Sequence, residues 1–434
     1  MIVRLLVMVL SVAVAAALKV HTLWFVNTVS GGRKGVALKS LLKRRFGTRF
    51  VADLTRDGEA QDMLRAFTPL INEKEHVCCV VCGGDGTVGW VLQHIKESKE
   101  LRLENLPIAI FPLGTGNDLS RALGWGGGIL KNIDDNFLIE YLMDLEAATP
   151  EQIDQWYAQI DTNVFRYFNS DNEFMRGRNK LSQSKDVLAM AGYFGLGIDA
   201  QIAMEFDAQR RRTPHYFSSQ LTNKGWYAFF GGRNLLRSVM NNSTRGSFSK
   251  NALEGFNTNS ESLQSLSILL DGKCLAKIPS TAQGLIFLNI NSFMGGGRMW
   301  DVAQKRGDGL WWSKYQSCTT ASPLSCTNIS DSADGLINIF AVDGSIHLGR
   351  ILLGMSRPHR VGQAAFVEIA SAGAWPIQID GEPRYLQGPW SLHLKVSEEP
   401  AIFLRNSRDY CSSITRHGLA SHLIQLYSAE KGLM

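Results

Sequence analysis

The chain has 434 residues, 45% of them hydrophobic and 20% charged, and its formal net charge is +5. This length excludes a single small domain and suits two or three compact units, and the apolar fraction excludes a chain that is disordered as a whole. The mild basicity is below that of nucleic-acid-binding proteins, so no nucleic-acid partner is predicted, whereas an anionic membrane surface or a phosphorylated ligand fits.

Residues 1–18 form an apolar segment with one charge, on Arg4, and with Ser11 as the one polar interruption between Leu5 and Leu18. The apolar core is shorter than the about 20 residues that span a bilayer. Its three consecutive alanines resemble the small-residue end of a signal peptide. The sequence therefore predicts a cleaved signal peptide, which places the protein in the secretory pathway or outside the cell, or a membrane anchor, which keeps it at a membrane surface. A buried first helix is the remaining alternative.

Three short apolar segments, at residues 21–26, 77–82 and 108–111, each end in a glycine-rich loop that leads into a helical pattern. Alternating buried strands and helices predict a parallel α/β sheet, whose ligand crevice lies at the carboxyl ends of the strands. Glycine leaves the N–H groups of a loop uncovered, and the following helix N-terminus adds a positive dipole end, so such loops suit phosphate groups. The candidate nucleotide-binding residues are Asn27, Ser30, Gly31, Gly32, Gly83, Gly84, Gly86, Thr87, Gly114, Thr115, Gly116 and Asn117.

Charged residues in these loops refine the expected chemistry. Asp85 would repel bare phosphates, so its position predicts a group that organises Mg²⁺ or a base beside an acceptor hydroxyl. Asp118 has two open interpretations: it contacts the acceptor alcohol or a metal ion, or it caps the helix that follows. Lys34 either offsets phosphate charge or belongs to a solvated loop.

After about residue 150 the pattern changes to a polar stretch and then to apolar strands separated by turns. Strands are expected at residues 283–290, 335–342 and 364–369, without helices of useful length between them, which favours an antiparallel β-sandwich. The expected units are an N-terminal segment at 1–18, a first domain at 19–150, a polar linker at 151–185, a second domain at 186–390, and a C-terminal segment at 391–434 that packs back on the first domain.

The seven cysteines are an odd number in a long chain, so no disulfide framework is predicted. Cys79 and Cys82 have the spacing of a zinc pair, but they lie in an apolar run. They are therefore expected to be buried small hydrophobic residues.

In combination, the three loops resemble the catalytic domain of eukaryotic diacylglycerol kinases. The matching segments are Asn27-x-x-Ser30-Gly31-Gly32, residues 83–90 and residues 112–119, continued by residues 125–128. Residues 193–202, 223–224, 293–297 and 378–382 are similar to the accessory domain of the same family. The second loop alone is not specific, because NAD kinases and sphingosine kinases share it.

The resemblance implies a diacylglycerol kinase/NAD kinase-like fold, with an ATP-binding catalytic domain and a β-rich, lipid-binding accessory domain. It also implies ATP and Mg²⁺ as cosubstrates, diacylglycerol as acceptor and phosphatidic acid as product. Asp85 and Glu382 are its two candidates for the proton acceptor; we favour Glu382 as base and Asp85 as organiser of metal or phosphate, and the two roles are exchangeable. Asp334 resembles an acidic turn that holds a structural Mg²⁺, with a plain turn as the alternative.

Two other functions fit parts of the pattern. A kinase of the same fold would act on a sphingoid base or ceramide, and a non-catalytic lipid-binding protein would keep the fold and lose the phosphate loops. All three loops keep their glycines and polar residues, which favours an enzyme. No Cys/His-rich lipid-sensing module or EF-hand loop is expected before residue 20, so the family's usual regulatory modules are not predicted.

Overall fold

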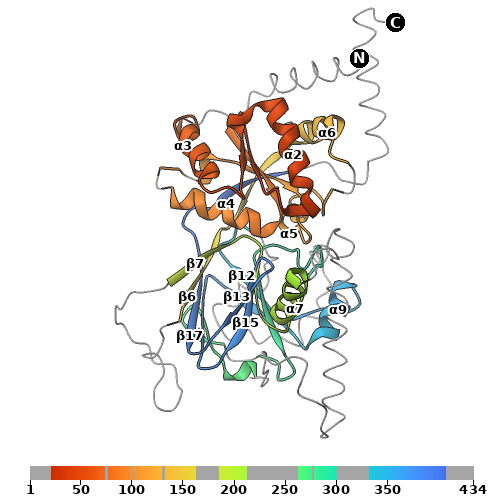
Figure 1. Ribbon diagram of the computed structural model, residues 1–434. Helices are drawn as coiled ribbons and strands as arrows, with labels where there is room; N and C mark the ends of the chain where they lie inside the picture. Colours follow the sequence, from red (N-terminus) through yellow and green to blue (C-terminus); the bar gives the residue numbers. More distant parts are fainter. Residues whose placement is uncertain are drawn as a thin grey trace, which may run out of the picture.

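The computed structural model of the chain shows two domains stacked one above the other (Figure 1). The predicted signal or anchor segment at residues 1–18 lies outside the described residues. Within the described part of the chain, no helix has both the length and the apolar character needed to cross a bilayer. The described residues are 21–73, 77–98, 100–101, 103–129, 132–162, 185–212, 262–275, 278–300 and 332–406.

The first domain contains a six-stranded sheet in the order β2-β1-β3-β4-β18-β5. The first five strands in this order run parallel, and β5 runs antiparallel to β18, so the prediction of a parallel α/β sheet is confirmed. The strands are β1 (His21–Val26), β2 (Val51–Asp53), β3 (Val77–Gly83), β4 (Ile108–Pro112), β5 (Thr149–Ile153) and β18 (Ala401–Arg405).

Every residue of β3 is buried, as expected for a central parallel strand covered on both faces. Its thiols contribute packing. Burial raises the pKa of Cys78 to about 11 and that of Cys79 and Cys82 well above the usual value, so these groups stay protonated. The expectation that Cys79 and Cys82 are buried small hydrophobic residues is confirmed.

Helices cover the sheet of the first domain (Figure 1). In α3 the buried residues Ala60, Met63, Leu64, Phe67 and Ile71 recur at the three- and four-residue spacing of a helix that packs one face against a core. The helical elements are α2 (Ser30–Phe46), α3 (Glu59–Asn72), α4 (Asp85–Glu97), α5 (Asp118–Ala122) and α6 (Asp135–Glu146), with short 3₁₀ turns η1 (Thr48–Phe50) and η2 (Leu103–Asn105).

The second domain contains two six-stranded sheets, ordered β10-β9-β14-β17-β6-β7 and β13-β12-β11-β8-β15-β16. Their strand pairs are antiparallel, and one hydrophobic cluster that includes Trp156, Phe287 and Trp390 joins the two, which confirms the predicted mainly antiparallel domain. The strands are β6 (Trp156–Asp161), β7 (Lys185–Met190), β8 (Tyr193–Gly197), β9 (Ser267–Leu270), β10 (Lys273–Cys274), β11 (Gly284–Leu288), β12 (Ile337–Val342), β13 (His359–Ala364), β14 (Phe366–Ser371), β15 (Trp375–Ile379), β16 (Glu382–Leu386) and β17 (Trp390–Val396).

Two helices, α7 (Ile198–Arg212) and α9 (Ser345–Leu352), and the 3₁₀ turn η4 (Leu263–Ser265) complete the second domain. The sequence did not predict α9, because an eight-residue helix between two strands spans too few turns for a clear helical period.

The chain crosses between the domains at both ends of the second domain. Residues 156–161, inside the range predicted as a linker, form β6 of an accessory sheet, because Trp156, Ala158 and Ile160 alternate into its core. At the other end, β18 returns to the first domain and pairs with β4, and Trp125 Nε1 donates to the carbonyl of Leu404 at 2.6 Å. The C-terminal strand thus becomes part of the first sheet.

Candidate active site

The first two glycine loops are joined by a hydrogen bond from Asn27 Nδ2 to Thr87 Oγ1 at 3.1 Å. In the first loop Gly31 and Gly32 have φ of 62° and 66°, a region that side chains disfavour. A Cβ atom on Gly31 would lie 2.7 Å from the carbonyl oxygen of Leu113, at the end of β4. The first loop therefore packs directly on the third, and a larger residue would separate them.

The second and third loops also touch through their backbones. A Cβ atom on Gly114 would lie 2.4 Å from Gly84 Cα, and the carbonyl of Gly83 accepts the N–H of Leu113 at 2.9 Å. A Cβ atom on Gly83 would lie 2.5 Å from the side chain of Thr87, which covers this glycine. The glycines predicted from the sequence are thus brought together at one end of the sheet.

Ser30 and Thr115 are partly buried, and Ser30 begins α2. Lys34, one turn further along α2, donates from Nζ to the carbonyl oxygen of Ile129 at 2.6 Å. In this structure the lysine therefore ties α2 to the segment that follows α5.

Asn117 holds the third loop in a left-handed turn, with φ of 51°. Its Nδ2 donates to the carbonyls of Gly114 at 2.7 Å and Gly127 at 3.0 Å. Its Oδ1 is buried and has no hydrogen-bond partner within the described residues. A buried acceptor without a donor costs about 1–3 kcal/mol, so this atom fits a ligand that supplies an N–H or O–H group between the second and third loops.

Asp85 accepts two backbone N–H groups from α5. Its Oδ2 accepts from Asp118 at 2.8 Å and its Oδ1 from Leu119 at 3.0 Å. The residue is partly exposed, but desolvation by the surrounding protein raises its pKa to about 7. The negative charge of Asp118 also raises this pKa, whereas the two backbone N–H groups lower it. Each carboxylate oxygen still has a lone pair available for a further donor or a metal ion.

Asp118 connects the two domains. Its carboxylate is 1% exposed and accepts Ser292 Oγ at 2.6 Å, the N–H of Gly295 at 2.9 Å and that of Gly296 at 2.9 Å. Burial raises its pKa, and these hydrogen bonds oppose the increase. The sequence left two interpretations of Asp118 open, a ligand of the acceptor or metal and a cap of its own helix. In the structure its carboxylate accepts hydrogen bonds from the 292–296 turn of the second domain. The side chain that caps α5 is that of Asp85.

Gly116 lies between these two carboxylates. A Cβ atom on Gly116 would lie 3.3 Å from Asp118 Oδ2 and 3.4 Å from Asp85 Oδ2. The absence of a side chain here lets both acidic groups approach the same loop.

Glu382 comes to the second loop from the second domain. It is the first residue of β16 and is exposed, and a Cβ atom on Gly86 would lie 3.0 Å from its Oε1. Glu382 therefore contacts the loop residue next to Asp85, and these are the two acidic residues that the family resemblance singled out. Their catalytic roles remain predictions.

Asp380 positions the turn that carries Glu382. Its Oδ1 accepts the N–H groups of Gly192 and Tyr193, and its Oδ2 that of Ala191, each at 2.8 Å. Burial raises its pKa to about 6 despite these three donors. Sequence reasoning assigned no role to this aspartate, because its donors lie 188 residues away along the chain; its signal was the left-handed Asp-Gly turn, in which Asp380 has φ of 48°.

Asp334 lies elsewhere, on an exposed turn before β12. Its Oδ1 accepts the N–H of Leu336 at 2.9 Å, and the adjacent Gly335 donates its N–H to Asp154 Oδ2 at 2.6 Å. These are the hydrogen bonds of an ordinary turn, and the carboxylate of Asp154 lies beside it. Its predicted Mg²⁺ role stays a prediction.

Comparison with known proteins agrees with this geometry. Residues 21–140 match the family described as "Diacylglycerol kinase catalytic domain", and residues 189–383 match "Diacylglycerol kinase accessory domain". The chain belongs to the diacylglycerol kinase family. Both matched segments contribute to the site, since the first carries the three glycine loops and the second carries Asp380 and Glu382.

Individual relatives are similar along most of the chain. Diacylglycerol kinase 2 of Arabidopsis thaliana is 31% identical over 386 residues, which cover 89% of this chain and 46% of that protein. Human diacylglycerol kinase theta is 28% identical over 385 residues, covering 88% of this chain and 35% of that protein. The chain thus spans less than half the length of these relatives. A crystal structure of a diacylglycerol kinase from Bacillus anthracis superimposes with a TM-score of 0.45 at 14% identity, covering 89% of this chain and 97% of that one.

Proposed function

We propose that this chain is an ATP-dependent lipid kinase that transfers the γ-phosphate of ATP to the free hydroxyl of diacylglycerol, giving phosphatidic acid and ADP. The observation that carries the proposal is the contact between Glu382 of the second domain and Gly86, beside Asp85, in a loop that packs on two further glycine loops. Phosphoryl transfer needs a phosphate cradle and acidic groups near the acceptor hydroxyl. The names of the relatives point to the same reaction.

The residues present fit a magnesium nucleotide. Asp85 keeps lone pairs on both carboxylate oxygens, and Glu382 is an exposed carboxylate; oxygen ligands of this kind suit Mg²⁺. When bound, Mg²⁺ supplies positive charge to the phosphate oxygens during transfer. The buried Oδ1 of Asn117 offers an acceptor for a nucleotide N–H or O–H group.

Glu382 is the proposed base. It is exposed and its side chain is free of the backbone donors that fix Asp85, so it has the freedom to meet a lipid hydroxyl and take its proton. Asp85 is held by two N–H groups at the start of α5, which suits an organiser of metal or phosphate. Asp118, through Ser292, keeps the second domain and hence Glu382 against the loops.

The enzyme is further proposed to act at an anionic membrane surface, where its lipid substrate and product reside. A signal peptide or membrane anchor at residues 1–18 would deliver it there or to the secretory pathway. Sequencing the N-terminus of the mature protein tests this part: a start near Leu18 supports cleavage, and an intact Met1 supports retention of the segment.

The direct test is to incubate the purified full chain with ATP, Mg²⁺ and mixed micelles that contain diacylglycerol, sphingosine and ceramide at equal concentration. The proposal expects phosphatidic acid as the main product. Phosphorylation of sphingosine or ceramide instead would assign the chain to a different acceptor on the same fold, and the absence of any lipid product would refute the kinase proposal.

A further inference from the structure

Three side chains that can bind metal gather in the second domain, outside the glycine loops and the family motifs. Asp343 directly follows β12, His347 lies in the first turn of α9, and His359 begins β13. One ligand atom from each lies within 4.8 Å of the others. Asp343 Oδ2 is 2.8 Å from His359 Nε2 and 3.5 Å from His347 Nδ1.

The tautomer of His347 is fixed by its neighbours. Its Nδ1 accepts the backbone N–H of Asp343 at 3.1 Å, so the proton lies on Nε2, which donates to the carbonyl of Arg357 at 2.8 Å. Metal-binding histidines commonly donate their second ring nitrogen to a carbonyl in this way. The lone pair of Nδ1 therefore lies on the side of Asp343, where a metal ion would replace the backbone N–H as its partner.

Asp343 has a similar support. Its Oδ1 accepts Thr281 Oγ1 at 2.7 Å, which leaves Oδ2 on the side of the two histidines. Partial burial alone would raise the pKa of Asp343, but the hydrogen bonds from His359 and Thr281 outweigh it and lower the pKa. The carboxylate is thus ionised at neutral pH, as a metal ligand must be.

We propose that Asp343 Oδ2, His347 Nδ1 and His359 Nε2 form a binding site for Zn²⁺, with water as the fourth ligand. Two imidazole nitrogens and one carboxylate oxygen are a common zinc ligand set, and imidazole favours Zn²⁺ over Mg²⁺ and Ca²⁺. Tetrahedral zinc with bonds of about 2.0–2.2 Å places its ligand atoms roughly 3.3 Å apart, and the observed separations of 2.8 and 3.5 Å lie on either side of that value.

The ion would take the place of the hydrogen that bridges His359 Nε2 and Asp343 Oδ2, so a neutral His359 would bind it through Nε2 and carry its own proton on Nδ1. The side chain of His359 is 37% exposed, which gives the ion access. β13 is the edge strand of its sheet. The ion would therefore link the end of β12, the first turn of α9 and the start of this edge strand. The role is structural and separate from the phosphoryl-transfer site.

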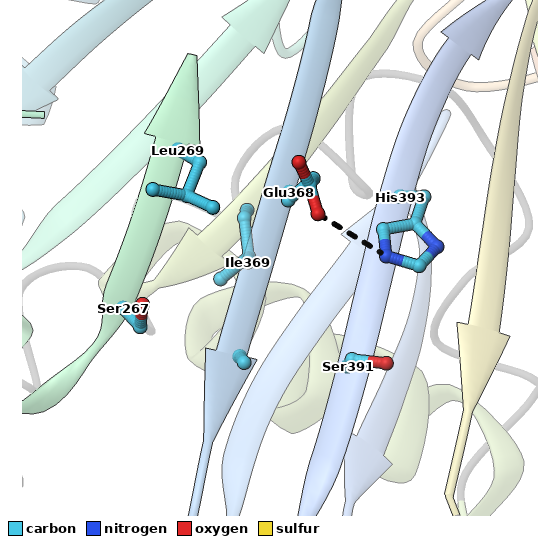
Figure 2. A pocket seen from close by; sticks show the side chains of 7 residues that line it. Ser267, Leu269, Glu368, Ile369, Ser391 and His393 are labelled. Atoms are coloured by element: carbon cyan, nitrogen blue, oxygen red, sulfur yellow. Dashed lines mark ion pairs between the residues drawn. The ribbon is translucent and has the colours of Figure 1, made fainter. Parts of the chain in front are cut away.

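The chain offers a matched control on its other sheet. Figure 2 shows His393 and Glu368, which face each other across β17 and β14 with Nε2 and Oε2 3.9 Å apart. This imidazole–carboxylate pair lacks a third metal ligand among the described residues that line the same surface, Ser267, Leu269, Ile369, Ala370 and Ser391. His393→Gln therefore removes one histidine without touching the proposed site.

The test titrates ZnCl₂ into the metal-free full chain in competition with a fluorescent zinc indicator. Wild type and His393→Gln should bind one equivalent more than His347→Gln and His359→Gln, and excess Mg²⁺ should not compete. Thr281→Val should weaken that equivalent by about 10- to 100-fold, the usual effect of losing a group that orients a ligand. Affinity should fall on going from about pH 7.5 to about pH 6, since protons compete with the ion.

Circular dichroism of each variant checks that it is folded; if either histidine variant is not, Asp343→Asn and Thr281→Val carry the comparison. Equal zinc uptake by wild type and the folded variants at positions 343, 347 and 359 would overturn the proposal. A wild-type chain that binds no zinc in competition with the indicator would overturn it as well.

Discussion

Glu382, at the start of β16, lies against Gly86 in the first turn of α4, so close that a Cβ atom on the glycine would lie 3.0 Å from Glu382 Oε1. The contact joins the second domain to the middle glycine loop of the first. Asp380 fixes the turn before Glu382, and Asp118 fixes the facing turn of the second domain. The position of the proposed base therefore depends on both domains together.

Gly86→Ala should lower kcat by up to about 100-fold, because displacement of a catalytic group by about 1 Å has effects of that size. Stability should not fall, because Gly86 lies in a helix, where alanine is favoured over glycine by about 1 kcal/mol, and the crowded atoms are the end of a flexible side chain. Gly349→Ala in α9 is the control, since its Cβ would meet nothing within 4 Å. Equal kcat in both variants would show that the Glu382 contact is not needed.

Glu382→Gln should reduce kcat by about 10²- to 10⁴-fold, the usual contribution of a general base, and leave the KM for ATP nearly unchanged. The side chain is exposed, so the melting temperature should also stay the same. Glu398→Gln, another exposed glutamate of this domain, is the control. A variant that keeps full kcat would move the base role to Asp85, as the exchangeable assignment allows.

Asp85→Asn should abolish binding of Mg²⁺-ATP and destabilise the fold by about 1–3 kcal/mol, because the new amide group turns a donor toward the N–H of Asp118 or Leu119. Calorimetric titration and denaturant unfolding measure the two effects. Asp62→Asn on the exposed face of α3 should change neither. Normal nucleotide affinity in a folded Asp85→Asn would argue against Asp85 as organiser.

Buried carboxylates make stability depend on pH. Burial raises the pKa of Asp199 to about 6, opposed by its hydrogen bond from Gln378, against about 3.9 in an unfolded chain. The folded state therefore binds more protons than the unfolded state between about pH 4 and 6, and the stabilisation from Asp199 is lost as pH rises through this window.

Asp199→Asn removes this titration. Its melting temperature should decrease less than that of wild type when the pH is raised from about 4 to about 7, as followed by circular dichroism. The same slope in both proteins would mean that Asp199 keeps an ordinary pKa.

The fold and the phosphate loops were predictable because their signals are local. Each apolar run ends in glycines at the tip of a strand. Gly84 packs on Gly114 and Gly31 on Leu113, so the three loops meet as parallel topology requires. The sequence identified Asp85, Asp118 and Glu382 as candidate site residues, but it did not predict which groups each carboxylate contacts.

What the sequence could not show depends on contacts between distant segments. Asp118 and Ser292 are 174 residues apart, and nothing near Asp118 distinguishes a domain contact from a helix cap. The same holds for β18, which joins a sheet whose other strands lie in the first 153 residues. These pairings are decided by tertiary packing.

The most direct test of the kinase account is the formation of labelled phosphatidic acid from diacylglycerol and γ-labelled ATP by the purified chain. The account predicts product that requires Mg²⁺, that Glu382→Gln loses and that Glu398→Gln retains. Contradiction would come from a folded wild-type chain that binds Mg²⁺-ATP and diacylglycerol and forms no phosphatidic acid; equal product with Glu382→Gln would move the base role to Asp85 and leave the kinase account standing.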